Sequence, residues 1–120
     1  MVTTKCIYEP AAASDGYRVL VTHYWPRGVA KDKIDAWEKQ LGTPPELIKQ
    51  WKAKEIGWPQ FRRAYLQAVK NQQEKIAGLA ARARRQTVTL LCSCKDASHC
   101  HRTILAQLVD VHAAPEYTGP

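Results

Sequence analysis

The sequence lacks the features of membrane and secreted proteins. None of its apolar runs approaches the roughly 18 residues that a membrane-spanning helix needs. The chain does not open with a basic segment followed by an apolar one, as a secretory leader would. We therefore expect a cytoplasmic protein without membrane contact. Internal repeats are also missing, so the 120 residues predict one domain over residues 1–112. Residues 113–120 have no periodicity and contain two prolines, which predicts a disordered tail.

Acidic residues are scarce relative to basic ones, with 11 Asp and Glu against 18 Lys and Arg and a net charge of +7. Such a balance favours acidic partners, namely nucleic acid, phosphorylated metabolites or anionic surfaces, although it is also typical of an ordinary solvated surface. Basic clusters lie at Arg62-Arg63 and at Arg82, Arg84 and Arg85. No helix-turn-helix, zinc-finger or RNA-recognition signature accompanies them. A nucleic-acid-binding module therefore stands as an alternative, and no pattern indicates an oligomeric state.

Cysteine is also sparse, and its distribution is uneven. The chain has four cysteines: Cys6, Cys92, Cys94 and Cys100. Cytoplasmic cysteines are expected to be reduced. Three of the four crowd into the stretch 92–102, which suits chemistry or metal binding better than a disulfide framework.

Three segments have the pattern of strands and four have the pattern of helices. Residues 87–91 are uncharged and residues 19–21 are continuously apolar, which is typical of strands covered on both faces. The expected strands span 3–8, 17–24 and 87–91. The expected helices span 32–41, 43–56, 58–80 and 98–112. Because the helical segment between the last two strands demands a crossover, those strands are expected to be parallel. The sequence thus predicts an α/β fold, a small three-stranded, at least partly parallel sheet packed by about four helices.

Two loops of this predicted sheet carry basic residues. Ligands of α/β proteins bind outside the carboxyl ends of parallel strands. Arg27 and Gly28 follow the second strand, and Lys95 follows the third. The start of the last helix, which carries Arg102, offers free N–H groups and a partial positive charge, and Gly28 allows close backbone approach. We therefore predict a pocket in which Arg27, Gly28, Lys95 and Arg102 bind a small anionic molecule.

The predicted pocket also carries a candidate reactive thiol. Cys100 falls in the first turn of the expected last helix, where the helix dipole, His101 and Arg102 lower the pKa of a thiol. We interpret Cys100 as a nucleophile or redox thiol, Cys94 as its resolving partner and His101 as a catalytic neighbour. The alternative is that these cysteines, Cys92 most of all, only pack a tight turn. A phosphatase-type loop is disfavoured because the spacing from Cys94 to Arg102 does not match it.

Metal binding is the other alternative for this stretch. Its soft ligands are Cys92, Cys94, His99, Cys100 and His101. His99 and His101 would lie roughly 200° apart on a helix, so both cannot face one ion. On that geometry we predict no metal site and no bound cofactor. The residues suit an enzyme and a binding protein alike.

Three stretches carry a resemblance to known proteins. They are Tyr24-Trp25-Pro26-Arg27-Gly28 with Lys31; a helical middle with Leu47, Trp51, Trp58, Phe61, Arg62 and Tyr65; and Val88 to Cys92, continuing through Cys94-Lys95-Asp96 to Cys100-His101-Arg102 and Leu105. Together they resemble the DUF488 family of small, YeaO-like bacterial proteins. The resemblance covers residues 3–112. It implies a small α/β fold in which the two polar loops converge, and it brings no settled activity. The chain departs from the family pattern at Thr22-His23, where an Asp-Arg pair is more usual.

Overall fold

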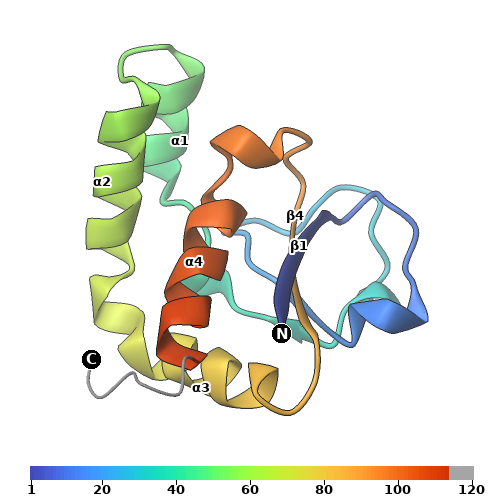
Figure 1. The fold of residues 1–120 in the computed structure, drawn as a ribbon. Helices are drawn as coiled ribbons and strands as arrows, with labels where there is room; N and C mark the ends of the chain where they lie inside the picture. The colour runs from blue at the N-terminus through green and yellow to red at the C-terminus, as the bar shows by residue number, and fades with distance from the viewer. Residues whose placement is uncertain (114–120) are drawn as a thin grey trace.

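The computed structural model describes residues 1–113, which form a four-stranded parallel sheet with helices beside it (Figure 1). The strands are β1 (Val2–Cys6), β2 (Tyr17–Leu20), β3 (Ala36–Trp37) and β4 (Val88–Cys92), in the spatial order β1-β4-β2-β3. The α-helices of the described part are α1 (Pro45–Lys52), α2 (Trp58–Ala68), α3 (Gln73–Ala83) and α4 (His101–Ala113). The α/β class and the parallel pairing agree with the sequence-based prediction, whereas the sheet has one more strand. Of the predicted tail, Ala113 ends α4 and the remainder lies outside the described residues.

The central strand is β4, and each of its residues is buried. It pairs in parallel with β1 on one side and with β2 on the other. Because side chains alternate along a strand, Val88 and Leu90 belong to the larger core and Leu91 belongs to a smaller one on the opposite face. The uncharged sequence of β4 is thus explained by apolar contacts on both faces.

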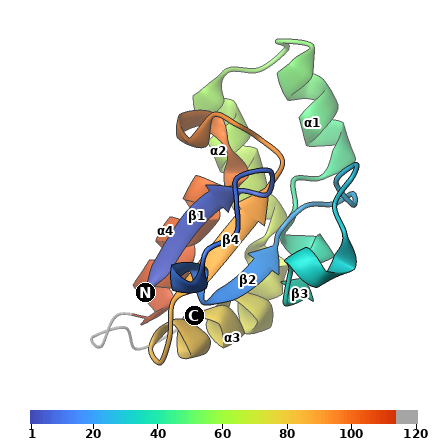
Figure 2. The same ribbon diagram turned by 90° about the vertical axis from the view of Figure 1, so that its right-hand side faces the viewer.

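The two faces of the sheet are covered differently. The helices lie together on one face, and Figure 2 shows them behind the sheet. There α4 contacts β1, β4, α2 and α3 around a core that includes Tyr65, Ile76 and Leu105. On the other face, Leu20 and Leu91 are covered by loop residues, among them Trp25, Val29 and Ile34. This arrangement leaves the carboxyl ends of β2 and β4 bordered by α1 and α2 on the helical side.

The segment after β2 differs from the predicted helix over 32–41. It forms a 3₁₀ turn at Lys31–Lys33, the short strand β3 and a second 3₁₀ turn at Lys39–Leu41. Pairing with β2 competes with helix formation here, because β3 forms hydrogen bonds with backbone groups at the edge of β2. The Trp37 indole Nε1 donates to the carbonyl of Thr22 at 2.7 Å. Trp37 is therefore 38% exposed at the sheet edge rather than a core residue of a helix.

The predicted helix 58–80 is divided, and the last helix starts later than expected. A 3₁₀ turn at Lys70–Gln72 separates α2 from α3. The chain before α4 forms another 3₁₀ turn, Ala97–His99, because the Asp96 carboxylate accepts from the N–H of Ser98 at 3.0 Å. Consequently α4 begins at His101 rather than near residue 98. None of the helices within residues 1–113 is long and apolar enough to cross a bilayer.

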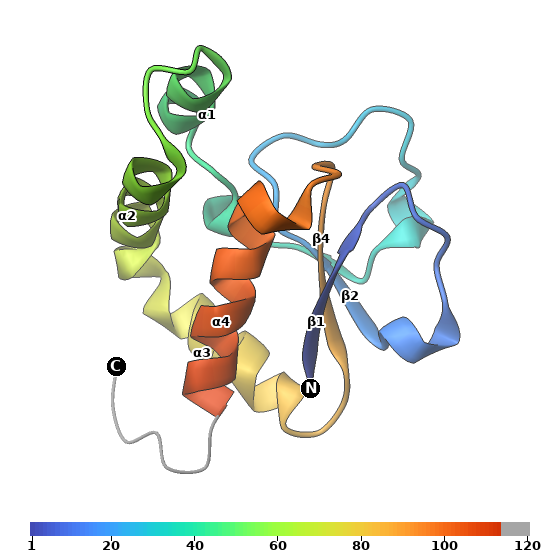
Figure 3. The same cartoon turned by 45° about the horizontal axis from the view of Figure 1, so that its top comes forward.

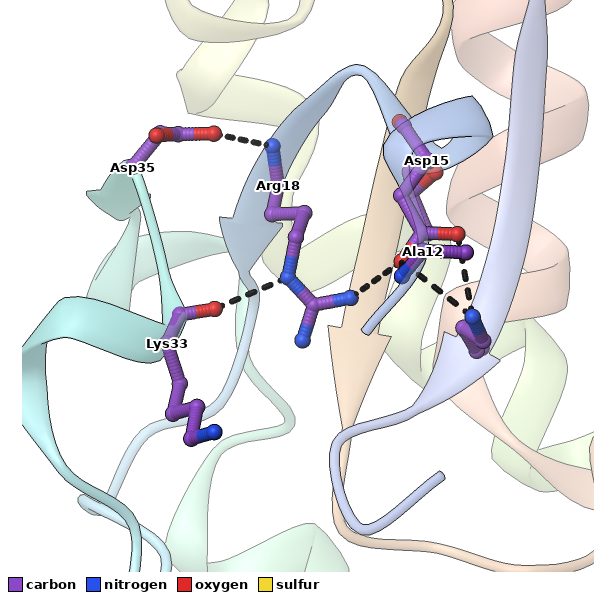
Figure 4. Close-up of polar contacts among 7 residues, drawn as sticks. Ala12, Asp15, Arg18, Lys33 and Asp35 are labelled. Carbon is purple, nitrogen blue, oxygen red and sulfur yellow. Dashed lines mark hydrogen bonds and ion pairs between the residues drawn. The ribbon is translucent and has the colours of Figure 1, made fainter. Parts of the chain in front are cut away.

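A buried ion-pair network connects strands β1 and β2 (Figure 4). The Asp15 carboxylate accepts hydrogen bonds from Lys5 Nζ at 3.0 Å, from the guanidinium of Arg18 and from the N–H of Ala12. Burial works to raise the pKa of Asp15, but these three donors outweigh it and hold the pKa below its ordinary value of 3.8. Asp15 thereby connects β1 to β2 as a charged group.

Candidate functional site

The candidate site lies where β4 ends and α4 begins. Cys92 is the last residue of β4, and Cys100 comes immediately before α4. Figure 3 shows the loops after β2 and β4 side by side at the edge turned toward the viewer, as parallel pairing of these strands requires. The convergence of two polar loops expected from the sequence is therefore present. It brings together sulfur atoms, an imidazole and a guanidinium.

Two sulfur atoms and one arginine form the centre of the site. The Sγ atoms of Cys92 and Cys100 are 2.9 Å apart. Arg102 Nη1 donates to Cys92 Sγ at 3.1 Å and lies 3.7 Å from Cys100 Sγ, and it also donates to the carbonyl of Cys94. The N–H of Cys94 is a further donor to Cys92 Sγ, at 3.4 Å. Cys92 thus receives more donors than Cys100.

These contacts move the pKa values of the two thiols in opposite directions. The hydrogen bond from Cys100 is the largest influence on Cys92. Together with the hydrogen bond and charge of Arg102, it outweighs burial and lowers the pKa of Cys92 to about 6. Cys100 donates to that sulfur, is buried and faces its negative charge, so the pKa of Cys100 is raised far above its usual range. The pair therefore loses one proton readily, from Cys92, and keeps the second on Cys100.

His101 is a neutral, fixed imidazole beside the sulfurs. Its Nε2 is hydrogen-bonded to the carbonyl of Val21, and because a carbonyl only accepts, Nε2 carries the proton. Burial is the main reason that the pKa of His101 falls to about 4, assisted by the charge of Arg102. Nδ1 is therefore unprotonated at neutral pH, and it lies 3.8 Å from Cys100 Sγ. His101 is placed to accept from the Cys100 thiol.

A pocket of about 530 Å³ opens onto this cluster. Its lining comes from the loops after β2 and β4, from α1 and from α2. The lining residues are Thr22, His23, Tyr24, Thr43, Ile48, Trp51, Lys52, Phe61, Cys92, Ser93, Cys94, His99, Cys100 and His101. Aromatic rings and one lysine are among them, and no carboxylate is. A hollow of about 780 Å³ beside Trp25 and Trp37 has no thiol or histidine in its lining, so the chemistry belongs to the smaller pocket.

Comparison with known proteins places the chain in a family. The family described as the active DUF488-N3 subclade matches residues 2–113. The chain belongs to the DUF488 family. Uncharacterized protein YeaO of Escherichia coli is 36% identical over 107 residues, which cover 88% of this chain and 93% of YeaO. Uncharacterized protein Rv3073c of Mycobacterium tuberculosis is 27% identical over 106 residues, which cover 87% of this chain and 89% of that protein. No solved structure matches. The resemblance inferred from the sequence is thus confirmed.

The site residues predicted for this DUF488 chain fall into two groups. Cys94, Cys100 and His101 line the pocket, and Arg102, which is outside the lining, contacts Cys94 and Cys100. Cys100 precedes α4 in an extended conformation, so it is not in the first helical turn. Cys94 is half-buried, and its Sγ points to the carbonyl of Asp96 at 3.6 Å rather than to another sulfur.

Arg27, Gly28 and Lys95 form the second group, and they do not line the pocket. Arg27 and Lys95 are exposed. Lys95 follows Cys94, a lining residue, so it lies near the pocket. Gly28 has a φ of +77° with open space around it, which explains the glycine by backbone conformation rather than by close approach.

Two residues of the DUF488 site escape sequence reasoning. The sequence pattern assigns Cys92 mainly to packing, yet this residue receives the donors that stabilise a thiolate. Its position at the carboxyl end of a buried strand is the signal that could have identified it. Lys52 gives no such signal, because it reaches the pocket only through the packing of α1 beside the loops.

A metal ion is the remaining chemical possibility for this cluster. Ligand atoms of Cys92, Cys100 and His101 lie within 4.8 Å of one another, and His99 is not among them. The carbonyl of Val21 would orient His101, as backbone carbonyls commonly do behind metal-bound histidines. However, two thiolates on one zinc ion are about 3.7 Å apart, wider than the 2.9 Å found here. The Arg102 cation beside both sulfurs also opposes a dication, so the residues fit a pair of one thiolate and one thiol better than a metal.

Proposed function

We propose that this DUF488 protein is a thiol-dependent enzyme in which the Cys92 thiolate attacks a small anionic molecule bound in the adjacent pocket. The environment of Arg102 carries the proposal. Only 3% of Arg102 is exposed, and within residues 1–113 no carboxylate pairs with it. Because a buried cation needs a counter-ion, the sulfur atoms that it contacts are the groups able to supply the charge. An ionised Cys92 at neutral pH satisfies that need.

The lining of the pocket supports a substrate with an anionic group and a flat or apolar part. Tyr24, Trp51 and Phe61 provide ring surfaces, and Lys52 provides a positive charge without a carboxylate in the lining to neutralise it. Lys95, which follows the lining residue Cys94, would add positive charge near the mouth. Since Arg102 is already engaged with Cys92, Lys52 is the residue that we assign to the anion.

The neighbours of Cys92 have distinct roles in this proposal. Cys100 donates a hydrogen bond that stabilises the thiolate. His101 Nδ1 lies 3.8 Å from Cys100 Sγ and can receive the thiol proton once Cys92 no longer accepts it. The N–H of Cys94 donates to the same thiolate. Cys94 itself is assigned a supporting position, because its sulfur is directed to backbone carbonyls.

The ionisation of Cys92 can be followed in the folded protein by the ultraviolet absorbance of the thiolate, which requires no reagent to enter the pocket. We expect the wild type to ionise one thiol near pH 6, because the hydrogen bond from Cys100, then Arg102 and the N–H of Cys94, stabilise the anion. Cys92→Ser should abolish this step. Cys6→Ser, a matched change of a buried cysteine outside the pocket, should leave it intact. A first ionisation above pH 8 in the wild type would contradict the proposal.

The anion preference can be measured with two alkylating agents of nearly equal size. The quantity compared is the ratio of the alkylation rate with iodoacetate to that with neutral iodoacetamide. At Cys92 we expect this ratio to be roughly threefold or more higher than at a free peptide thiol, because Lys52 attracts the carboxylate. Lys52→Gln should remove this gain, whereas Lys49→Gln, on the same helix but outside the lining, should retain it. Arg27→Gln and Lys95→Gln test the outer positions. If the rate ratio stays the same in all three variants, at Lys52, Arg27 and Lys95, the result would argue against an anion site.

The nucleic-acid alternative draws less support from the placement of its basic clusters. The Arg82 guanidinium stacks on the ring of Tyr17 at 3.8 Å. Arg84 donates to the carbonyls of His112 and Ala113 at the end of α4, at 2.9 Å and 3.2 Å. In the cluster of Arg82, Arg84 and Arg85, two of the three arginines are therefore engaged in intramolecular contacts. These contacts reduce the charge that this cluster could offer to phosphates.

A further inference from the structure

We propose that Cys92 and Cys100 form a dithiol–disulfide pair through which this protein reduces hydroperoxides, with hydrogen peroxide as the best substrate. This inference goes beyond the proposed function, because hydrogen peroxide is uncharged and does not need the anion site, and it rests only on the thiolate at Cys92. The observation behind it is the 2.9 Å separation of the two sulfur atoms. A disulfide bond is about 2.05 Å long, so the sulfurs have little distance left to cover.

The choice of Cys100 as the partner follows from where the other two thiols point. Cys6 Sγ lies near the carbonyl of Ser93, at 3.8 Å, and is not part of the pocket lining. Cys94 Sγ is directed to the carbonyls of Asp96 and His99. Among the four cysteines, which all lie within the described residues, Cys100 is thus the one that faces Cys92.

The two thiols are unequal, as a peroxide reductase requires. Arg102 and the N–H of Cys94 both donate to Cys92 Sγ, which marks it as the attacking thiolate. Cys100 keeps its proton and has His101 Nδ1 nearby to receive it. The Cys92 sulfur can therefore be oxidised first, and the Cys100 thiol then acts as the resolving thiol.

Arg102 also has a donor that nothing else uses. Its Nε is buried and has no hydrogen-bond partner within the described part of the chain. A buried donor without a partner is costly and is usually satisfied by a ligand or water. The oxygen atoms of a peroxide bound at Cys92 are acceptors of the right kind, and the arginine charge would stabilise the oxygen anion that leaves.

The narrow exposure of the sulfurs selects for a small oxidant. Cys92 is 1% exposed and Cys100 is 2% exposed, although both line the pocket. A larger hydroperoxide has to bring its terminal oxygen to a sulfur with almost no open surface while its remainder stays in the pocket, whereas hydrogen peroxide is close to water in size. We therefore expect hydrogen peroxide to react faster than tert-butyl hydroperoxide.

The reaction balances in two steps. In the first, the Cys92 thiolate attacks the terminal oxygen of the hydroperoxide; the S–O bond forms, the O–O bond breaks, and the alkoxide or hydroxide leaves with the electron pair, giving a sulfenic acid. In the second, Cys100 loses its proton and attacks Cys92 Sγ; the S–S bond forms, the S–O bond breaks, and hydroxide leaves as water with that proton. Two thiol molecules from a small-molecule reductant then return the disulfide to the dithiol.

The experiment treats the reduced full chain with one equivalent of hydrogen peroxide at pH 7 and follows intact mass. We expect a loss of about 2 Da from a Cys92–Cys100 disulfide, formed at least roughly tenfold faster than oxidation of a free peptide thiol. Cys100→Ser should instead gain about 16 Da as a sulfenic acid that dimedone traps at Cys92. Cys92→Ser should not react, and Cys6→Ser, a change of a buried cysteine outside the pocket lining, should behave as the wild type.

The outcomes separate this inference from the proposed function. If Cys92 ionises near pH 6 but peroxide produces neither a disulfide nor a sulfenic acid faster than in a peptide, the peroxide inference is overturned and the proposed function stands. If no thiolate forms near that pH, both fail. A disulfide between other cysteines, or stoichiometric zinc that blocks the reaction in protein purified without chelator, would also overturn the dithiol–disulfide pair.

Discussion

Replacing Arg102 with methionine is expected to raise the pKa of Cys92 from about 6 to roughly 8 or higher, because burial then acts on a thiolate without its cation. At pH 7 the ionised share of Cys92 would fall roughly tenfold, and reactions of the thiolate would slow by a similar factor. Methionine preserves most of the apolar contacts of the arginine stem. The thiolate absorbance as a function of pH measures the change directly.

Two further variants make this result specific. Arg102→Lys keeps a positive charge but not the planar group that reaches Cys92, Cys94 and Cys100 together, so it should give an intermediate pKa. Arg63→Met removes an exposed arginine from α2 and should leave the ionisation near pH 6. If the folded Arg102→Met protein, checked by circular dichroism, still ionises near pH 6, then Arg102 does not stabilise the thiolate.

The fold could be predicted from the sequence in those segments whose local pattern agrees with their tertiary contacts. The strand around Leu90 and the parallel crossover follow from an uncharged apolar run and from the length of the helical segment. The strand β3 could not be predicted, because Ile34, Trp37 and Leu41 have helical spacing. Pairing with β2 and the bond from Trp37 to Thr22 override that local preference. Tertiary contacts of this kind are not visible in periodicity.

The candidate site could be located but not resolved in detail. Strand ends in a parallel sheet identify the edge, and the cysteines and Arg102 identify the loop. Which sulfur carries the charge depends on distances of a few tenths of an ångström, such as 3.1 Å against 3.7 Å from Arg102 Nη1 to Cys92 and Cys100. Sequence spacing does not contain that information, which is why it indicates Cys100 rather than Cys92 as the activated thiol.

Asp15→Asn is expected to lower the free energy of unfolding at pH 7 by about 3 kcal/mol, because it leaves the nearly buried guanidinium of Arg18 without its carboxylate. The loss depends on pH with a defined sign. Since the folded pKa of Asp15 lies below its ordinary value of 3.8, the carboxylate stabilises the wild type fully above about pH 5. This contribution disappears as the pH falls through the folded pKa. The gap between wild type and variant should therefore close at low pH.

Urea unfolding of both proteins between pH 7 and pH 2.5 measures that gap. His101 also makes the fold less stable as pH falls, because its pKa is 6.5 ordinarily and about 4 when folded. That effect operates between those two pH values and is common to both proteins, so it cancels in the difference and leaves the contribution of Asp15. Asp32→Asn, at an exposed aspartate that has no ion pair within residues 1–113, should change stability by less than about 0.5 kcal/mol. A gap that stays constant down to pH 2.5 would mean that the Asp15→Asn substitution disturbs packing and that the charge of Asp15 contributes nothing.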